Sequence, residues 1–319
     1  NKDVLYEVME KATAFYEKNI VGQKSALEYL TKRGLTPKTI REWRIGFAPN
    51  EWKSVLTDLQ AKKVRIEDIQ KVGLIKPSEK NPRDFYDRFR SRIMFPLFDT
   101  SGRAIAFSGR IFGEVDDGKS AKYINSPETA LFDKSKTLYG YHLAKRRIRE
   151  VDYSLLVEGQ MDLLLSHQAG FTNAVASSGT ALTTGHLEQL RRLSNRLMVA
   201  YDADKAGVAA SERAWQTALS LGMDIKMAPI TAGEDPADII KKDPAAFKEM
   251  VKHGKHVIEF YLKALMSRGL SDRALGKEVE AEILPYVKAI ESPIDQNRFI
   301  SYISSRTDIA EDVLRAALR

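Results

Sequence analysis

Cysteine is absent from this 319-residue sequence, so neither a disulfide nor a thiolate metal site can form within it. Long apolar runs are absent too, because no stretch reaches the roughly 18 residues that a membrane-spanning helix needs. The opening NKDVLYEVMEK is amphipathic and contains acids, unlike a signal peptide, and it lacks an initiator methionine. We therefore expect part of a longer chain that works in the reducing cytoplasm, without a membrane partner.

The two halves of the sequence differ in charge. Residues 1–150 hold 30 Lys and Arg against 20 Asp and Glu, whereas residues 151–319 hold 20 against 23. A basic half indicates binding to a polyanion, and a mildly acidic half indicates a place for cations. The alternative is a solvated basic surface without a partner. The length and the 43% of hydrophobic residues allow two or three packed domains.

The basic half is predicted to mix helices and strands. Apolar residues recur at helical spacing from residue 5 to about residue 70. Residues 76–83 contain two prolines and are predicted to form a loop. Strands follow at 92–98 and 104–108 around a polar turn, and a further short strand is expected at 122–125.

From residue 151 short apolar strands alternate with helices. The predicted strands are 153–157, 173–176, 196–201 and 224–230. This alternation predicts a mostly parallel sheet covered by helices on both faces. Beyond about residue 243 only helical spacing is visible, which predicts a helical bundle. The expected fold class is therefore α/β, with an α+β domain at 1–150, the parallel sheet at 151–243 and the bundle at 244–319.

Acidic residues follow three of the predicted strands. Glu158 and Asp162 follow the first strand, Asp202 and Asp204 the third, and Asp235 the fourth. Because ligands gather at the carboxyl ends of parallel strands, we expect these carboxylates to share one site. Oxygen ligands at that density suit two or more Mg²⁺ or Mn²⁺ ions, which can drive nucleotidyl transfer. Each acid is also consistent with a helix N-cap, most clearly Asp235, but three clusters together favour metal binding.

Other positions leave alternatives open. Residues 177–180, SSGT, offer hydroxyls and amides to a phosphate or form only a polar turn. Phe89, Phe107 and Tyr123 can stack on unpaired bases or face a core, and the core role is favoured for Phe107. His253 and His256 lie about one turn apart, and we expect both at the surface rather than on a metal.

Several motifs resemble those of one known family. VEGQMD at 157–162, YDADKAG at 201–207 and EDP at 234–236 are similar to the Toprim domain of DnaG-type bacterial primases. In the basic half, RFRSRIMFP at 88–96, FSGR at 107–110 and KYINSPET at 122–129 resemble the signatures of the same family, in the same order. The acids alone fit any Toprim protein, and the basic half distinguishes a primase.

The resemblance implies synthesis of RNA primers on single-stranded DNA from ribonucleoside triphosphates. It implies a basic N-terminal subdomain, a central Toprim fold and a C-terminal helical subdomain. Glu158, Asp202 and Asp204 are implied to be catalytic and to bind metal, supported by the ligands Asp162 and Asp235. The residues implied to hold template and nucleotides are Arg88, Arg90, Arg92, Arg103, Arg110, Lys122, Tyr123 and Lys134.

The sequence departs from the family pattern in a few places. The family often has Asp-Pro-Asp in the last acidic motif, where Ala237 stands third and Asp238 follows. Gln160 and Ala203 lie where the family varies, and neither is assigned a chemical role. The family's zinc module and helicase-binding domain are not within this sequence. We therefore expect relaxed start-site choice here and a replicative helicase as partner of the full-length protein.

Two alternatives remain at this point. One is another Toprim enzyme, a nuclease or a topoisomerase, although no tyrosine here has the context of a DNA-gate nucleophile. The other is a single-stranded DNA-binding module without catalysis, which the acids at three strand ends argue against.

Overall fold

The computed structural model describes residues 2–113, 120–201, 205–231 and 233–318, with the backbone alone for residues 205–211. The chain forms two compact units, residues 1–144 with 159–180 and residues 145–158 with 181–319. The division into three domains at residues 150 and 243 stays a prediction.

The first unit combines helices with two antiparallel sheets. Its larger sheet has the order β1-β4-β5-β6, and β2 pairs with β3 in a hairpin. Its elements are α1 (Lys2–Val21), α2 (Lys24–Lys32), α3 (Pro37–Glu42), β1 (Gly46–Ala48), α4 (Ser54–Ala61), α5 (Ile66–Lys71), β2 (Ile75–Pro77), β3 (Phe85–Asp87), β4 (Arg92–Phe98), β5 (Ala104–Ile111), β6 (Tyr123–Asn125), α7 (Gln160–Gln168) and β8 (Ala174–Ala176). Helix α6 (Tyr141–Val151) begins in this unit and continues into the second.

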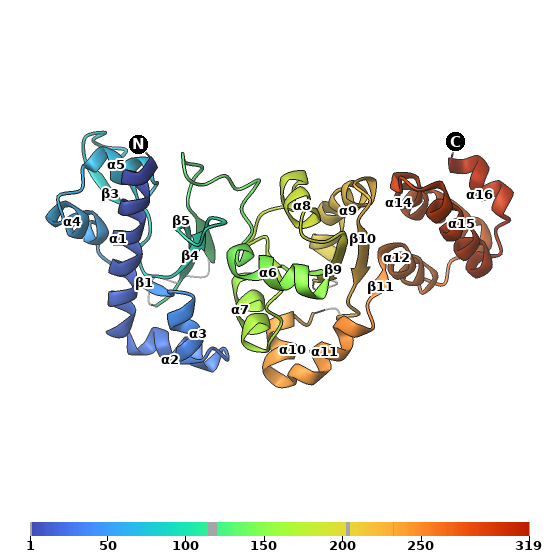
Figure 1. Cartoon of the computed structure of the whole chain (residues 1–319), viewed down its shortest axis with the longest axis horizontal. Coiled ribbons are helices and arrows are strands. Elements are labelled where there is room, and N and C mark those ends of the chain that lie inside the picture. The colour runs from blue at the N-terminus through green and yellow to red at the C-terminus, as the bar shows by residue number, and fades with distance from the viewer. Residues whose placement is uncertain (1, 114–119, 202–204, 232, 319) are drawn as a thin grey trace. The chain divides into compact units, whose positions relative to one another are not determined.

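Helix α1 supplies much of the core of the first unit. Its buried residues, among them Val8, Met9, Ala12 and Tyr16, recur every three or four positions and so form one apolar face. Helix α1 packs on β1 and β5, and it is the long dark-blue helix in Figure 1. At Gly46 in β1 an added Cβ would lie 2.5 Å from the Cβ of Tyr16, so only glycine allows the helix this close.

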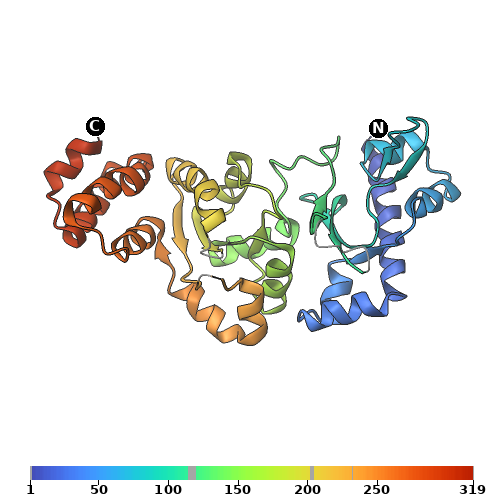
Figure 2. The ribbon, with the colours of Figure 1, turned by 180° about the vertical axis from the view of Figure 1, so that it is seen from behind.

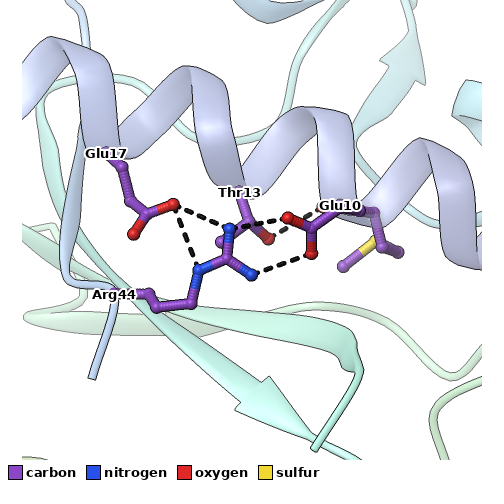
Figure 3. A network of polar contacts seen from close by, with 5 residues as sticks. Glu10, Thr13, Glu17 and Arg44 are labelled. Carbon is purple, nitrogen blue, oxygen red and sulfur yellow. Dashed lines mark hydrogen bonds and ion pairs between the residues drawn. The ribbon is translucent and has the colours of Figure 1, made fainter. Parts of the chain in front are cut away.

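An arginine on the loop before β1 ties that strand to α1 (Figure 3). The Arg44 guanidinium donates two hydrogen bonds to the Glu10 carboxylate, at 2.7 and 2.8 Å, and two more to Glu17. These bonds hold the pKa of Glu10 below its usual value. The fork geometry of the guanidinium therefore fixes the direction in which the chain enters the sheet.

Strand β4 is buried along its whole length and lies between β1 and β5. It contains Pro96, which has no N–H to donate. Because β1 pairs only with Arg92–Met94, the proline lies beyond the part of β4 that β1 covers, and this position tolerates it. Phe89 and Phe107 pack edge-to-face beneath this sheet, and Phe89 is only 1% exposed. Of the two roles left open for Phe89, the structure shows the core role, and the core role favoured for Phe107 is confirmed.

The second unit contains a mostly parallel sheet followed by helices. Within this unit the strand order is β11-β10-β9-β7, with β7, β9 and β10 parallel and β11 antiparallel. Its elements are β7 (Ser154–Val157), α8 (Thr184–Arg191), β9 (Arg196–Ala200), α9 (Lys205–Ser220), β10 (Asp224–Met227), α10 (Pro236–Lys242), α11 (Pro244–Lys252), β11 (Lys255–His256), α12 (Val257–Met266), α13 (Asp272–Glu278), a π-helical turn (Val279–Ile283), α14 (Leu284–Ala289), α15 (Pro293–Thr307) and α16 (Glu311–Leu318). The predicted mixed fold with a parallel sheet is confirmed.

The C-terminal part is helical apart from the two residues of β11. Helix α14 contacts α15 and α16, and Figure 2 shows these helices from behind. His256 is not the surface residue predicted from sequence, because its ring stacks on Phe299 with centroids 4.2 Å apart and its Nδ1 accepts the N–H of Ile258. Burial lowers the pKa of His256 to about 4, so the ring is neutral at pH 7. Among the described helices, none is long and apolar enough to cross a bilayer.

Candidate nucleic-acid interface

The predicted acidic residues occupy different structural positions. Glu158 is exposed and directly follows β7, whereas Asp162 is buried in the first turn of α7. The Asp162 Oδ2 atom accepts the N–H of Gly159 at 3.0 Å, which closes that turn. Asp235 caps α10, as its N-cap alternative predicted, and accepts the N–H of Asp238 at 2.7 Å. Asp202 and Asp204 lie outside the described residues.

The chemistry of the predicted ligand atoms indicates which divalent cation they suit. Over residues 2–113, 120–201, 205–231 and 233–318, no three His, Asp or Glu side chains converge on a common point. The donors that the sequence predicts are all carboxylates, which fits Mg²⁺ or Mn²⁺ rather than zinc. Ala237 is buried in α10 and Asp238 is exposed.

Strands β5 and β6 together present a polar face. Ser108 and Arg110 lie two residues apart on β5 and so point to the same side, and their register partners on β6 are Asn125 and Tyr123. We call these four residues the β5–β6 polar face. They come from the predicted motifs FSGR and KYINSPET, which the sheet brings side by side.

Two segments of the first unit are hydrogen-bonded to the polar face. The Gln160 amide, at the start of α7, donates to the Ser108 hydroxyl at 2.7 Å. The Asn125 amide donates to the carbonyl of Ser178 at 3.2 Å. Ser178 lies at φ 55°, and the Thr180 hydroxyl donates to the Ser177 carbonyl, so residues 177–180 form the polar turn that was one of their two predicted roles.

Three buried polar atoms on this face or on the adjoining turn lack a partner within the described chain. They are Nε of Arg110, Oδ1 of Asn125 and Oγ of Ser178. Leaving a buried donor or acceptor unpaired costs about 1–3 kcal/mol, so such atoms indicate a bound ligand or ordered water. Burial raises the pKa of Tyr123 to about 12, opposed by nearby Arg110, so its phenol is a neutral hydrogen-bond donor. The face therefore offers a cation, hydroxyls and amides to a ligand.

Tyr29 of α2 lies near Arg110, Arg33 at the C-cap of α2 lies near Tyr29, and neither residue belongs to a predicted motif. The Arg110 guanidinium carbon lies 4.6 Å from the ring centroid of Tyr29. Arg33, one helical turn later, donates to the Tyr29 hydroxyl at 3.3 Å. The spacing of an aromatic residue and an arginine at i and i+4 is a usable sequence signal. The spacing predicts that Tyr29 and Arg33 contact each other, but only the structure shows that Tyr29 also contacts Arg110 of β5.

A second aromatic and cationic cluster lies on the surface of the first unit. The Arg90 guanidinium carbon is 3.4 Å from the ring centroid of Trp52, Tyr86 meets Trp52 edge-to-face at 5.5 Å, and Lys76 lies 5.0 Å from the Tyr86 ring. We call Lys76, Tyr86, Trp52 and Arg90 the cation–aromatic ladder. Trp52 is 59% exposed, which is unusual for so large an apolar side chain. Of the four, only Arg90 was predicted from sequence.

Three predicted arginines have partners within the protein. The Arg88 Nε donates to the Gly73 carbonyl at 2.8 Å. Arg92 is only 8% exposed and donates to the carbonyls of Gly109 and Ala121. Arg103 pairs with Asp99 at 2.9 Å in the hairpin turn. Arg103 precedes β5 and Arg110 lies near its end, so about 23 Å of strand separates them and they do not form one site.

The remaining predicted cations lie at or near the surface. Lys122 is exposed immediately before β6, next to Tyr123 of the polar face. Lys134 is half-buried, and its backbone N–H donates to the Glu128 carboxylate at 3.0 Å. The structure thus brings Arg110 and Tyr123 together on one face and places Arg90 in the ladder. The DNA- and nucleotide-binding roles of all eight residues stay predictions.

Comparison with known proteins gives a consistent result. The sequence model described as the DNA primase catalytic core, N-terminal domain, matches residues 15–145, and a Toprim-like model matches residues 155–240. The DNA primase of Clostridium acetobutylicum is 35% identical over 321 residues, which cover 98% of this chain and 51% of that protein. The chain therefore spans about half the length of this curated relative.

Two solved structures match over nearly their whole length. A DNA primase domain from Pseudomonas aeruginosa superposes with a TM-score of 0.83 at 30% identity, covering 98% of this chain and 99% of that one. A DnaG primase catalytic domain bound to single-stranded DNA gives the same TM-score and identity, with 98% of each chain covered. The motifs, the fold and these matches agree, and the chain belongs to the family of DnaG primase catalytic cores.

Proposed function

We propose that this chain copies single-stranded DNA into short RNA primers from ribonucleoside triphosphates, with Mg²⁺ or Mn²⁺ as cofactor. The observation that carries the proposal is the β5–β6 polar face, whose buried unpaired groups lie within a primase core. Relatives about twice as long as this chain are DNA primases, and one similar catalytic domain is bound to single-stranded DNA. A replicative helicase and the RNA primer itself are the further partners of this proposal.

The cation–aromatic ladder is the proposed contact for unpaired template. An exposed indole next to a guanidinium stacks on any base, and the flanking cations neutralise phosphates without reading sequence. Base–aromatic stacking contributes about 1–3 kcal/mol per base. Trp52, Tyr86 and Lys76 therefore join Arg90 as proposed DNA-binding residues.

Within the β5–β6 polar face, Arg110 and Tyr123 are the proposed nucleotide contacts, together with Lys122 immediately before β6. Arg110 offers a guanidinium whose Nε is buried and unpaired, and a triphosphate oxygen is a suitable acceptor for it. The neutral phenol of Tyr123 can donate to a phosphate or a ribose hydroxyl, and the exposed Lys122 adds a cation for a phosphate of the nucleotide or of the template. These side chains bind and orient the nucleotide, and their partial burial limits the access of water.

The acidic residues are the proposed holders of the cations. Glu158, Asp202 and Asp204 are the proposed main ligands, with Asp162 and Asp235 in support. Divalent ions bound there would supply activation of a 3′-hydroxyl and charge stabilisation for the departing pyrophosphate. The three-domain division, with a basic subdomain, a Toprim subdomain and a helical subdomain, is part of the same proposal.

The test is to incubate the chain with a single-stranded template, labelled ribonucleotides and either Mg²⁺ or Mn²⁺. Short labelled RNA is expected, and it should vanish when the template or the metal is omitted. The Asp202→Asn variant should make no RNA while binding DNA as the wild type does. DNA binding without incorporation would support a binding module instead, and degradation of labelled DNA without nucleotides would support a nuclease.

A further inference from the structure

The first residue of helix α7 makes a buried contact that the proposed chemistry does not use. Gln160 is 4% exposed, and its Nε2 donates to the hydroxyl of Ser108, 52 residues earlier in the chain, at 2.7 Å. Ser108 is fully buried in β5. An apolar side chain in place of Gln160 would leave that hydroxyl buried without this partner, which has a cost in free energy.

This contact joins two parts of the proposed nucleotide site. On β5, Ser108 lies two residues before Arg110 and points to the same side. On α7, Gln160 lies in the same first turn as Asp162, whose carboxylate accepts the N–H of Gly159. The hydrogen bond between Gln160 and Ser108 therefore connects the strand that carries the cation to the turn that carries the acid.

We propose that Gln160 is a positioning residue, which holds the turn from Gly159 to Asp162 at a fixed place against β5. This inference rests on the proposed function, because it concerns the alignment of groups that act on the nucleotide. Residues that orient active-site groups do not themselves touch the substrate. Their removal typically lowers activity by about 10- to 100-fold. Gln160 acts through Ser108 and the turn and is not itself in contact with substrate.

Helix α7 supplies a matched control at its other end. The Gln168 side-chain carbonyl accepts the N–H of Thr36 at 2.9 Å and the hydroxyl of Thr39 at 2.7 Å, and its amide donates to the Gly34 carbonyl at 2.8 Å. Gln168 thus also fastens α7 to the first unit. It lies about 12 Å along the helix from Gln160, since each residue adds about 1.5 Å. Its loss should loosen the helix without moving the turn.

The experiment compares Gln160→Met, Ser108→Ala, the double variant and Gln168→Ala in the whole chain. Hydrogen exchange at the amides of residues 159–162 should speed up in the first three variants and stay unchanged in Gln168→Ala. In primer synthesis, kcat should fall about tenfold in Gln160→Met and Ser108→Ala, with little change in the KM for ribonucleotides. The double variant should lose no more than either single variant, because both remove one interaction. Affinity for single-stranded DNA should stay at the wild-type value.

Three outcomes would overturn the inference. They are unchanged exchange at 159–162, an equal loss of kcat in Gln168→Ala, and full additivity in the double variant. If Gln160→Met does not fold, Ser108→Ala removes the same bond by a smaller change and decides the matter. If the wild type makes no RNA, the proposed function fails, while the exchange measurement still shows whether the Gln160–Ser108 contact holds the turn.

Discussion

Asp87 is a buried carboxylic acid directly beneath the cation–aromatic ladder. Its side chain accepts the N–H groups of Val55 and Leu56 at the start of α4, and its own N–H donates to the carbonyl of Trp52. Burial raises the pKa of Asp87 to about 6, although these backbone donors and the charge of Arg90 lower it. This residue therefore fixes the loop that carries Trp52 and also makes that region sensitive to pH.

The raised pKa predicts how stability changes with pH. Because the folded state holds this proton more tightly than the unfolded chain does, the contribution of Asp87 is fully present below about pH 4. It is lost as the pH rises through about 6, by on the order of 3 kcal/mol. In Asp87→Asn, which cannot ionise, this part of the decline should disappear. Urea unfolding of both proteins at several values between pH 4 and pH 7 measures it, and parallel curves would contradict the prediction.

Trp52 gives a second prediction for a single residue. Trp52→Ala should weaken binding of single-stranded DNA by between about 5- and 100-fold, because one stacking platform is lost. Trp52→Phe keeps an aromatic face and should lose much less. Because the side chain is mostly exposed, the midpoint of thermal unfolding should change little in either variant. Fluorescence anisotropy with a labelled oligonucleotide measures the affinity, and equal losses in the two variants would argue against stacking.

At the scale of elements, α7 is a short helix held at both ends by glutamines. Its sequence, QMDLLLSHQ, is buried over most of its length, so packing rather than an amphipathic pattern holds it in place. Trp43 packs edge-to-face on His167 near its C-terminal end, with ring centroids 4.9 Å apart. These contacts explain why residues 159–180 belong to the same compact unit as residues 1–144.

The fastening of α7 predicts a stability change. Gln168→Ala removes three hydrogen bonds to the segment that begins α3 and should lower the free energy of unfolding by about 2 kcal/mol. The control is Gln60→Ala, which changes an exposed glutamine of α4 and should be neutral within about 0.5 kcal/mol. Chemical denaturation of the two variants tests this, and an equally small effect in both would show that the α3 contact contributes little.

At the scale of the whole molecule, the uneven charge of the chain should govern the proposed binding of DNA. The excess of Lys and Arg lies in residues 1–150, while the rest of the chain is slightly acidic. Neutralised phosphates release counterions, so affinity for single strands falls with salt by a slope of about 0.7 per phosphate contact. Binding should therefore be strongly salt-dependent and nearly independent of sequence.

Removal of one exposed cation tests this picture. Lys122→Ala should weaken binding of template, since Lys122 is exposed beside the polar face. The salt slope should fall by about 0.7, the value of one phosphate contact. Lys277→Ala changes a cation of the helical C-terminal region and should leave the slope as it is. Binding isotherms at several salt concentrations measure both. A slope that stays the same in Lys122→Ala would remove this lysine from the DNA contact.

The sequence by itself determined the fold class and the family, because periodicity and motif order are local properties of the chain. The hairpin around residues 99–102, the parallel strands after residue 153 and the N-cap role of Asp235 all follow from neighbours a few positions away. The family motifs likewise needed no knowledge of contacts.

Only the tertiary structure decided which side chains meet. Nothing in the sequence relates Gln160 to Ser108, Trp52 to Arg90 or Tyr29 to Arg110, because 52, 38 and 81 positions separate them. The same limit explains why the role of Phe89 stayed open, since its neighbours in sequence are arginines but its neighbours in space are core residues. Burial and side-chain pairing depend on how distant segments pack against each other. A local stretch of sequence carries no information about its partner, so these contacts appear only in the tertiary structure.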